Sequence, residues 1–357
     1  MQVSLFITNS DQRGESALKK RILVAVSAIL IICVLLTFLG ALVMPKYTDN
    51  KEGALVGEYY GEAGDHDIVF IGDCEVYESI VPAVLWEKYG ISSYVRGSAQ
   101  QLVWQSYYLL EDTLRYEKPK VVVFNVMALK YGEPQREEYN RMTIDGMRWS
   151  SSKMGAINAS MTDEESFVEY VFPLLRFHSR ITSLSADDLK YAFERPQVSH
   201  SGYLMQTGIV PRTDFSEGRS ETDYTFSENA IKYLDMMREL CAENGIQFVL
   251  MKAPTNLWRY WWHDEWEAQV VEYADKYDLK YYNFIPLEKE IGIDWNTDTY
   301  DKGAHLNVYG AEKFTEYFGA ILAGELQMTD RRSDADLSAA WSARVERYYH
   351  ERNKGGK

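Results

Sequence analysis

The sequence is poor in cysteine, proline and basic side chains. Its 357 residues include three cysteines and nine prolines, which excludes a disulfide-rich scaffold and a proline-rich, low-complexity chain. Lysine and arginine number 38 against 53 aspartates and glutamates, a formal net charge of −15 at pH 7. Because nucleic-acid binding needs clustered basic side chains at the phosphates, we expect no nucleic-acid partner.

Motifs for metals and cofactors are also missing. The six histidines, at positions 66, 178, 200, 263, 305 and 350, lack the i,i+4 pairs and cysteine partners of a metal site. Neither a phosphate-binding loop nor a dinucleotide-binding fingerprint is present, so we expect no metal and no cofactor. What the chain does have is 46% hydrophobic residues, enough to bury a large core.

Residues 22–44 form a run without a single charge. A helix rises about 1.5 Å per residue, so this run can cross a hydrocarbon core of roughly 30 Å. Cleaved signal peptides usually have an apolar region of only about 7–15 residues, so the length favours an uncleaved signal anchor in the lipid bilayer. Lys19, Lys20 and Arg21 precede the run. The positive-inside rule therefore predicts a single-pass cell-membrane protein with residues 1–21 in the cytoplasm and the rest extracytoplasmic.

Beyond the apolar run, strand and helix patterns alternate. Continuous apolar strands separated by helices predict an α/β fold, with a parallel sheet of about five strands covered on both faces. The predicted strands are 67–71, 93–96, 120–126, 246–252 and 280–284. The predicted helices are 82–89, 101–116, 227–244, 266–277, 307–326 and 335–350.

Residues 131–226 break the alternation. We interpret them as an insertion or cap within one domain, with a helix at 163–177, because no linker-like change of composition marks a domain boundary. The expected organisation is a juxtamembrane linker at 45–65, one domain at 66–330, and a C-terminal helix and tail at 331–357.

Two polar segments could support chemistry. Gly72-Asp73-Cys74-Glu75 follows a predicted strand, where a small residue lets the backbone turn and present the next side chain. The alternative is an ordinary turn with an inert, buried thiol, and a disulfide with Cys241 is a further alternative.

The second segment is Asp298 to Asn307, which holds Asp301 and His305 before a predicted helix. An aspartate a few residues before a histidine can orient its ring and stabilise its charged form. The alternative is a solvated histidine at a helix start that Asn307 caps.

Together these segments resemble the SGNH/GDSL hydrolase superfamily over residues 66–325. IGDCEVY resembles its first block, usually Gly-Asp-Ser, and YDKGAHLNVYGAEKF resembles its last block. YVRGSAQ supplies Gly97, and VVVFNV supplies Asn125, at the oxyanion-hole positions. The sequence departs from the family pattern at Cys74, which replaces serine, and at Lys302, which occupies the usual aspartate position.

The resemblance implies a flavodoxin-like three-layer fold and a catalytic Cys-His-Asp set. Cys74 would be the nucleophile, His305 its base, and Asp301 the orienting carboxylate, with Asp298 in reserve. The membrane-anchored exterior members are the most similar: the teichoic-acid D-alanyl-transfer protein and the polysaccharide O-acetyltransferases. The expected activity is that of an esterase or O-acyltransferase on a cell-envelope glycan or polymer, with a multi-spanning membrane acyltransferase as a possible partner.

Aromatic and basic residues near the predicted sheet edge could bind such a polymer, because aromatic rings stack on sugars. The candidates are Trp258, Trp262, Lys252 and Arg148. The alternative for the tryptophans is packing of the cap against the sheet. Two other functions stay open: a catalytically inactive relative that binds polymer or a partner, and a structural protein of envelope assembly.

Overall fold

The computed structural model describes residues 9–45, 54–193 and 196–355. Two compact units emerge from the contacts within the chain. One, which we call the N-terminal unit, combines Met1–Lys46 with Ser166–Pro196. The other, the sheet unit, combines Tyr47–Glu165 with Gln197–Lys357.

The sheet unit is built on five parallel strands, as the alternating pattern predicts. Along the sheet they run in the order β2-β1-β3-β4-β5, which is the flavodoxin-like order. Their bounds are β1 Ile68–Gly72, β2 Ser93–Gly97, β3 Val121–Asn125, β4 Gln247–Lys252 and β5 Lys280–Asn283. The predicted fold class, an α/β protein with a central parallel sheet, is confirmed.

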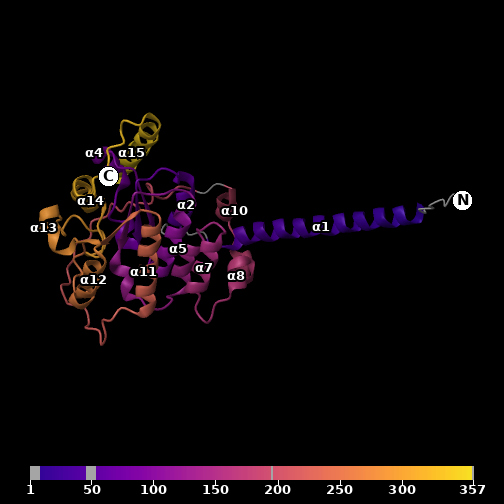
Figure 1. Cartoon of the computed structure of the whole chain (residues 1–357), viewed down its shortest axis with the longest axis horizontal. Helices are drawn as coiled ribbons and strands as arrows, with labels where there is room; N and C mark the ends of the chain where they lie inside the picture. Colours follow the sequence, from indigo (N-terminus) through magenta and orange to yellow (C-terminus); the bar gives the residue numbers. More distant parts are fainter. Residues whose placement is uncertain (1–8, 46–53, 194–195, 356–357) are drawn as a thin grey trace. The chain divides into compact units, whose positions relative to one another are not determined.

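Helices cover both faces of this sheet (Figure 1). Helices α4 (Pro82–Tyr89) and α14 (Val308–Gly324) pack on one face, and α5 (Val103–Thr113), α11 (Glu228–Glu243) and α12 (Asp264–Tyr277) pack on the other. The shorter helices of the unit are α2 Leu55–Glu62, α3 Cys74–Tyr77, η2 Val126–Lys130, α6 Glu137–Ile144, α7 Ser151–Ser160, η4 Ile285–Leu287 and α13 Glu288–Ile291.

Each central strand is apolar on both sides because each side meets a helix layer. In β1, Ile68 and Phe70 belong to the core that includes α4 and α14, whereas Val69 and Ile71 belong to the core that includes α5 and α11. Side chains alternate between the faces of a strand. A strand buried on both faces therefore appears in the sequence as a continuous apolar run rather than an alternating one.

Three segments differ from the expected organisation. The predicted helix 163–177 is divided into α8 (Phe167–Val171) and α9 (Pro173–Phe177), because Pro173 has no N–H and its ring clashes with the preceding turn. The expected linker 45–65 includes helix α2, whose apolar face is buried. The expected cap 131–226 is divided between the two units.

The C-terminal helix α15 (Ala335–Gly355) is packed onto the sheet unit. Its Trp341 is fully buried and stacks on Trp86 of α4, with ring centroids 5.4 Å apart. The C-terminal segment 331–357, for which we expect a helix and a tail, thus contains an outer helix of this unit that extends to Gly355.

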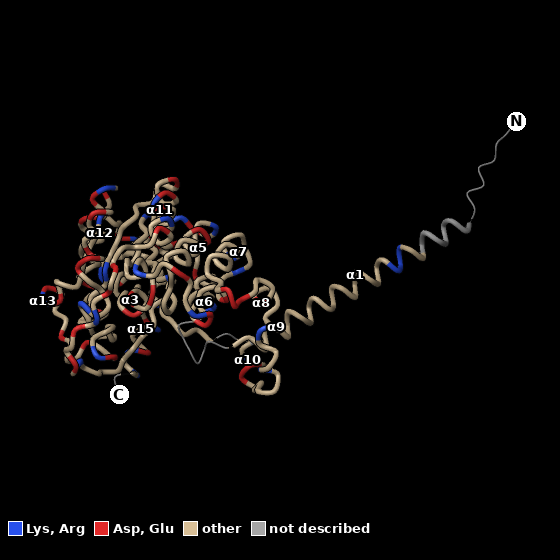
Figure 2. Tube along the Cα trace, turned by 90° about the horizontal axis from the view of Figure 1, so that it is seen from below, with Lys and Arg blue, Asp and Glu red and all other residues tan. Residues whose placement is uncertain are grey.

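The N-terminal unit contains α1 (Asn9–Val43), α8, α9, η3 (His178–Ser183) and α10 (Ala186–Phe193). From Ala17 to Val43, α1 is long and apolar enough for a membrane anchor or a signal sequence. Figure 2 shows one basic band on the described part of α1, with no charged residue beyond it along the helix.

Candidate active site

The candidate site lies where the central strands end. In a parallel sheet of this order, the crevice for a ligand forms at the carboxyl ends of the strands, where the strand order reverses. Here that point lies between β1 and β3. Gly72 ends β1, and a Cβ atom there would lie 2.5 Å from Val76 and 2.9 Å from Asn125. Glycine therefore lets α3 and the end of β3 approach this turn closely.

A buried polar network joins the ends of three strands. The Lys252 ammonium, at the end of β4, donates to both carboxylate oxygens of Glu75 at 2.8 and 2.7 Å. The amide of Asn125 donates to Glu75 at 3.0 Å and to Asp73 at 3.2 Å. The Asn125 oxygen accepts the Ala253 N–H at 3.2 Å. The network fixes the loop that presents Cys74, because its members come from β1, β3 and β4.

Asp301 and His305 form the second part of the site. One carboxylate oxygen of Asp301 lies 2.6 Å from Nδ1 of His305, and the other accepts the His305 backbone N–H at 2.8 Å. Asp298 instead binds the Lys313 ammonium at 2.6 Å and the Asp294 N–H at 2.8 Å. Of the two aspartates that the sequence left open, Asp301 is therefore the one in contact with His305.

Cys74 and His305 meet across the edge of the sheet. Cys74 is the first residue of α3 and is partly exposed, and its thiol and the His305 ring lie close enough for each to shift the pKa of the other. Since Nδ1 faces Asp301, Nε2 is the ring atom left for the thiol. Cys241 is buried in the core on the α11 face of the sheet, and both cysteines are free.

The electrostatics of the pair favour the protonated forms. Burial raises the pKa of the Cys74 thiol to about 11, although His305 acts in the opposite direction. Burial disfavours the charged form of His305, but Cys74, Asp301 and Glu78 outweigh it and hold the pKa of His305 well above its usual value. The nearest Glu78 oxygen lies 3.6 Å from Nδ1. Attack by the thiol therefore requires the Cys74–His305 pair to lose a proton first.

Aromatic rings flank His305. The Trp261 ring lies edge-on to it, with centroids 6.1 Å apart, and the Tyr300 ring is nearly parallel to it at 6.2 Å. The Tyr300 hydroxyl donates to Glu78 at 2.8 Å. Nε1 of Trp261 is buried and has no hydrogen-bond partner among the described residues. Trp261 lies between the predicted candidates Trp258 and Trp262 in the sequence, but it is not among the predicted residues.

Lys130 is a further charged group that the sequence did not single out. Its ammonium donates to the Trp261 carbonyl at 3.2 Å. Burial lowers the pKa of Lys130 to about 8, although Glu75 and Asp73 act in the opposite direction. Burial, reinforced by Glu75, also raises the pKa of Asp73 to about 6. For both Lys130 and Asp73, which follow the ends of β3 and β1, burial outweighs the stabilising effect of nearby opposite charges.

The remaining predicted residues have other partners. Gly97 pairs in register with Gly72, where a Cβ atom would lie 2.9 Å from both the Gly72 carbonyl oxygen and the Tyr77 ring. Both hydrogens of the Asn125 amide point to carboxylates within the chain, so its oxyanion role stays a prediction. Lys252 is fully buried against Glu75.

The predicted substrate-binding aromatic and arginine side chains contact other residues of the chain. Trp262 is fully buried and donates to Glu267 at 2.9 Å, and Trp258 packs against the same core. The Arg148 guanidinium lies 4.5 Å from the centroid of the Tyr60 ring. These contacts match the packing alternative for the two tryptophans.

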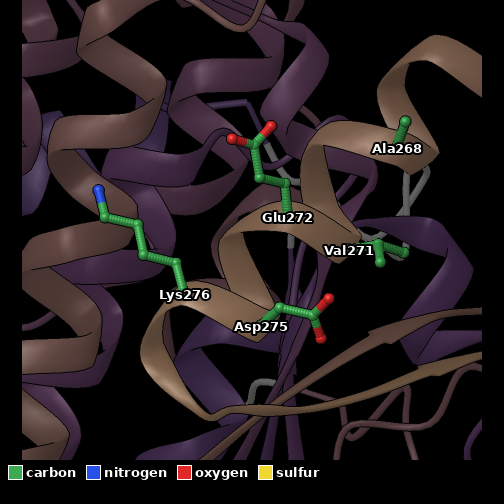
Figure 3. A pocket seen from close by; sticks show the side chains of 5 residues that line it. All are labelled: Ala268, Val271, Glu272, Asp275 and Lys276. Carbon is green, nitrogen blue, oxygen red and sulfur yellow. The ribbon is translucent and has the colours of Figure 1, made fainter.

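A surface hollow of about 700 Å³ lies away from these groups. Figure 3 shows its five side chains, all from successive turns of α12: Ala268, Val271, Glu272, Asp275 and Lys276. It contains neither a nucleophile nor a histidine, so we do not assign the chemistry to it.

No protein-family model matches the chain, and no curated protein matches it. Among solved structures, it is similar to a protein from Bacteroides fragilis NCTC 9343 described as a "putative acylhydrolase", at 10% identity and a TM-score of 0.36. That match covers 79% of this chain and 97% of the other. A GDSL-like lipase from Bacteroides thetaiotaomicron VPI-5482 matches at 11% identity and a TM-score of 0.35, covering 77% and 98%. The functional argument therefore rests on the contacts within this chain.

Proposed function

We propose that the chain is a membrane-anchored, extracytoplasmic esterase or acyltransferase of the SGNH/GDSL type, with a cysteine nucleophile. The observation that supports this most directly is the chain of contacts from Asp301 to His305 to Cys74 at the carboxyl edge of the sheet. A nucleophile, a base and a group that orients the base are what acyl transfer needs.

In this proposal, His305 takes the thiol proton as the sulfur attacks the carbonyl carbon of an ester. A carbon–sulfur bond forms, the carbon–oxygen bond to the alcohol breaks, and the imidazolium returns the proton to the departing oxygen. His305 then deprotonates water, or a hydroxyl of an acceptor, whose oxygen attacks the thioester carbon; the carbon–sulfur bond breaks, and the imidazolium returns the proton to the Cys74 sulfur. Asp301 keeps the imidazole oriented and stabilises its charged form in both steps.

The proposed substrate is an O-acyl group on a glycan or polymer of the cell envelope. The apolar helix at the start of the chain supports a location at the membrane, with the sheet unit outside, because Lys19, Lys20 and Arg21 precede it. Transfer rather than hydrolysis would require an acceptor to exclude water, and a multi-spanning membrane acyltransferase is the partner we propose as the acyl donor.

Trapping the acyl group on Cys74 tests the proposal. The full-length chain in detergent would be mixed with p-nitrophenyl acetate, stopped in acid, digested and analysed by mass spectrometry. We expect acetyl on the peptide that contains Cys74, and no turnover in Cys74→Ala. Cys241→Ala is the matched control, because that thiol is buried on the other face of the sheet. Equal turnover in the wild type and Cys74→Ala would refute the nucleophile.

A second candidate function is an inactive relative that binds an envelope polymer or a partner protein. The observations that favour it are the raised pKa of the Cys74 thiol, about 11 because of burial, and the Asn125 amide, whose hydrogens are already engaged. This alternative predicts no acetylated peptide, together with binding of envelope polymer that is equal in the wild type and in Cys74→Ala.

A further inference from the structure

The segment from Phe167 to Phe193 has an unusual surface. Eight large apolar side chains between Val168 and Phe193 are at least 36% exposed, including Leu175 at 53% and Phe193 at 74%. The described part of the much longer sheet unit also exposes eight. A dense exposed apolar patch marks a surface that is covered by something other than water.

One ion pair of this segment is largely sheltered inside it. One Arg180 nitrogen donates to Asp188 at 3.0 Å, and Asp188 accepts the N–H of Ser185 at 2.9 Å. The Asp188 side chain is only 7% exposed. A charged pair sheltered inside a segment that exposes many large apolar side chains is unusual for a surface that faces water.

The segment is built on the last turns of α1. Arg180 donates to the carbonyl oxygens of Val43 and Met44, at the C-terminal end of α1, at 2.8 and 2.7 Å. The rings of Phe38 and Phe193 lie 6.2 Å apart, and a Cβ atom on Gly40 would lie 3.5 Å from Pro173. The segment therefore packs against the end of α1 from about residue 38 onward.

The position along α1 matches the depth of a membrane interface. Residues 38–44 span about 10 Å at 1.5 Å per residue. Helices that lie in a membrane interface bury their apolar face by about 5–10 Å. The apolar surface of α1 itself continues directly into the apolar surface of this segment, so one lipid phase can cover both.

We propose that Phe167–Phe193 is a membrane-interfacial collar, which lies in the headgroup and upper acyl region of the outer leaflet around the exit of α1. The collar holds α1 through Arg180 and adds apolar area to a single-span anchor. This inference depends on the anchoring role of α1 in the proposed function, but not on the chemistry of Cys74.

Depth-dependent fluorescence quenching tests the collar. The full chain would carry an NBD fluorophore on a single introduced cysteine, Leu175→Cys or Leu189→Cys, with Cys33→Ser and Cys74→Ala in the background. The matched control is Phe215→Cys, since Phe215 is an apolar residue of the sheet unit that is 69% exposed. Each labelled chain would be placed, one copy per disc, in nanodiscs with nitroxide at acyl carbon 5.

We expect blue-shifted, quenched emission at positions 175 and 189, and water-like, unquenched emission at 215. In a separate chain that keeps Leu175 and Leu189, the fluorophore is attached to the native Cys33, which lies within the apolar part of α1. The emission of this chain reports on the anchor alone. Quenching at Cys33 with water-like emission at 175 and 189 would overturn the collar and leave the anchor intact. Water-like emission at positions 175 and 189 is also expected if the apolar surface of Phe167–Phe193 binds a protein or a second copy of the chain, because neither is present in the disc.

Discussion

The two halves of the candidate site are built in different ways. The half beneath Cys74 is a buried network of charged and amide side chains at the ends of three strands, in which the Lys252 side chain has no exposed area and that of Glu75 is 4% exposed. The half that holds His305 is one loop with bonds between close neighbours, and its Asp301 side chain is 27% exposed. A sealed network fixes position, whereas a loop near solvent can exchange protons. We infer that the first half sets geometry and the second sets protonation.

The largest effect should come from the loop. In Asp301→Asn, the His305 ring loses the carboxylate that selects its tautomer, so kcat should fall by roughly 10⁴-fold, as for such a change in a catalytic triad. The free energy of unfolding should change little, because Asp301 is partly exposed. Steady-state ester hydrolysis and chemical denaturation of the full chain in detergent would measure the two.

Asp298→Asn is the control for this change. It breaks the contact with Lys313 rather than with His305, so it should lower stability while kcat stays within an order of magnitude of the wild type. A loss of kcat in Asp298→Asn that exceeds the loss in Asp301→Asn would contradict the assignment of the orienting carboxylate.

Substitutions in the buried network should mainly lower the free energy of unfolding. Lys252→Met leaves the Glu75 carboxylate buried without its cation, which typically costs about 3–5 kcal/mol of unfolding free energy. Lys88→Met is the matched control, because Lys88 and Glu316 form an exposed pair with side chains 46% and 55% exposed, and such pairs are worth about 0–1 kcal/mol. Adding Glu75→Gln to Lys252→Met should restore part of the loss. Equal losses of unfolding free energy in Lys252→Met and Lys88→Met would show that the buried pair contributes no more to stability than the exposed pair.

These differences explain what the sequence could and could not predict. The strands were predictable because runs such as 121–124 are apolar throughout, and burial on both faces requires that. The contact between Asp301 and His305 is local, so a motif could indicate it. The pairing of Lys252 with Glu75 joins residues 177 positions apart, and no local pattern reports such a contact.

The tryptophan-rich turn shows a second limit. The sequence analysis selected Trp258 and Trp262, and the structure instead brings Trp261 close to His305. Arg259 has a φ of 61°, a left-handed conformation that interrupts any regular period of side-chain direction. In such a turn, neither the helix period nor the strand period tells which ring faces the site.

The pH dependence of kcat/KM should report on the half of the site that holds His305. A His305 pKa held above its usual value keeps the ring protonated to higher pH, so kcat/KM should rise with pH through an apparent pKa above about 6.5. Glu78→Gln removes a negative charge beside the imidazolium, which should lower that pKa by about one unit and move the rise to lower pH. A pH profile of Glu78→Gln that coincides with the wild type would show that Glu78 does not act on His305.

The smallest effect should come from Trp261→Phe, which keeps an aromatic ring beside His305 but removes a buried N–H that has no partner in the described structure. Removing an unsatisfied donor should leave stability equal or higher. If that N–H binds an acceptor on the substrate, KM should rise by at most about tenfold, since a hydrogen bond contributes about 0.5–1.5 kcal/mol. Trp262→Phe should behave in the opposite way, because its N–H already donates to Glu267: stability falls and KM stays. Denaturation curves and KM for the two variants decide between a substrate contact and a packing residue, and a stability loss in Trp261→Phe with unchanged KM would assign Trp261 to the core.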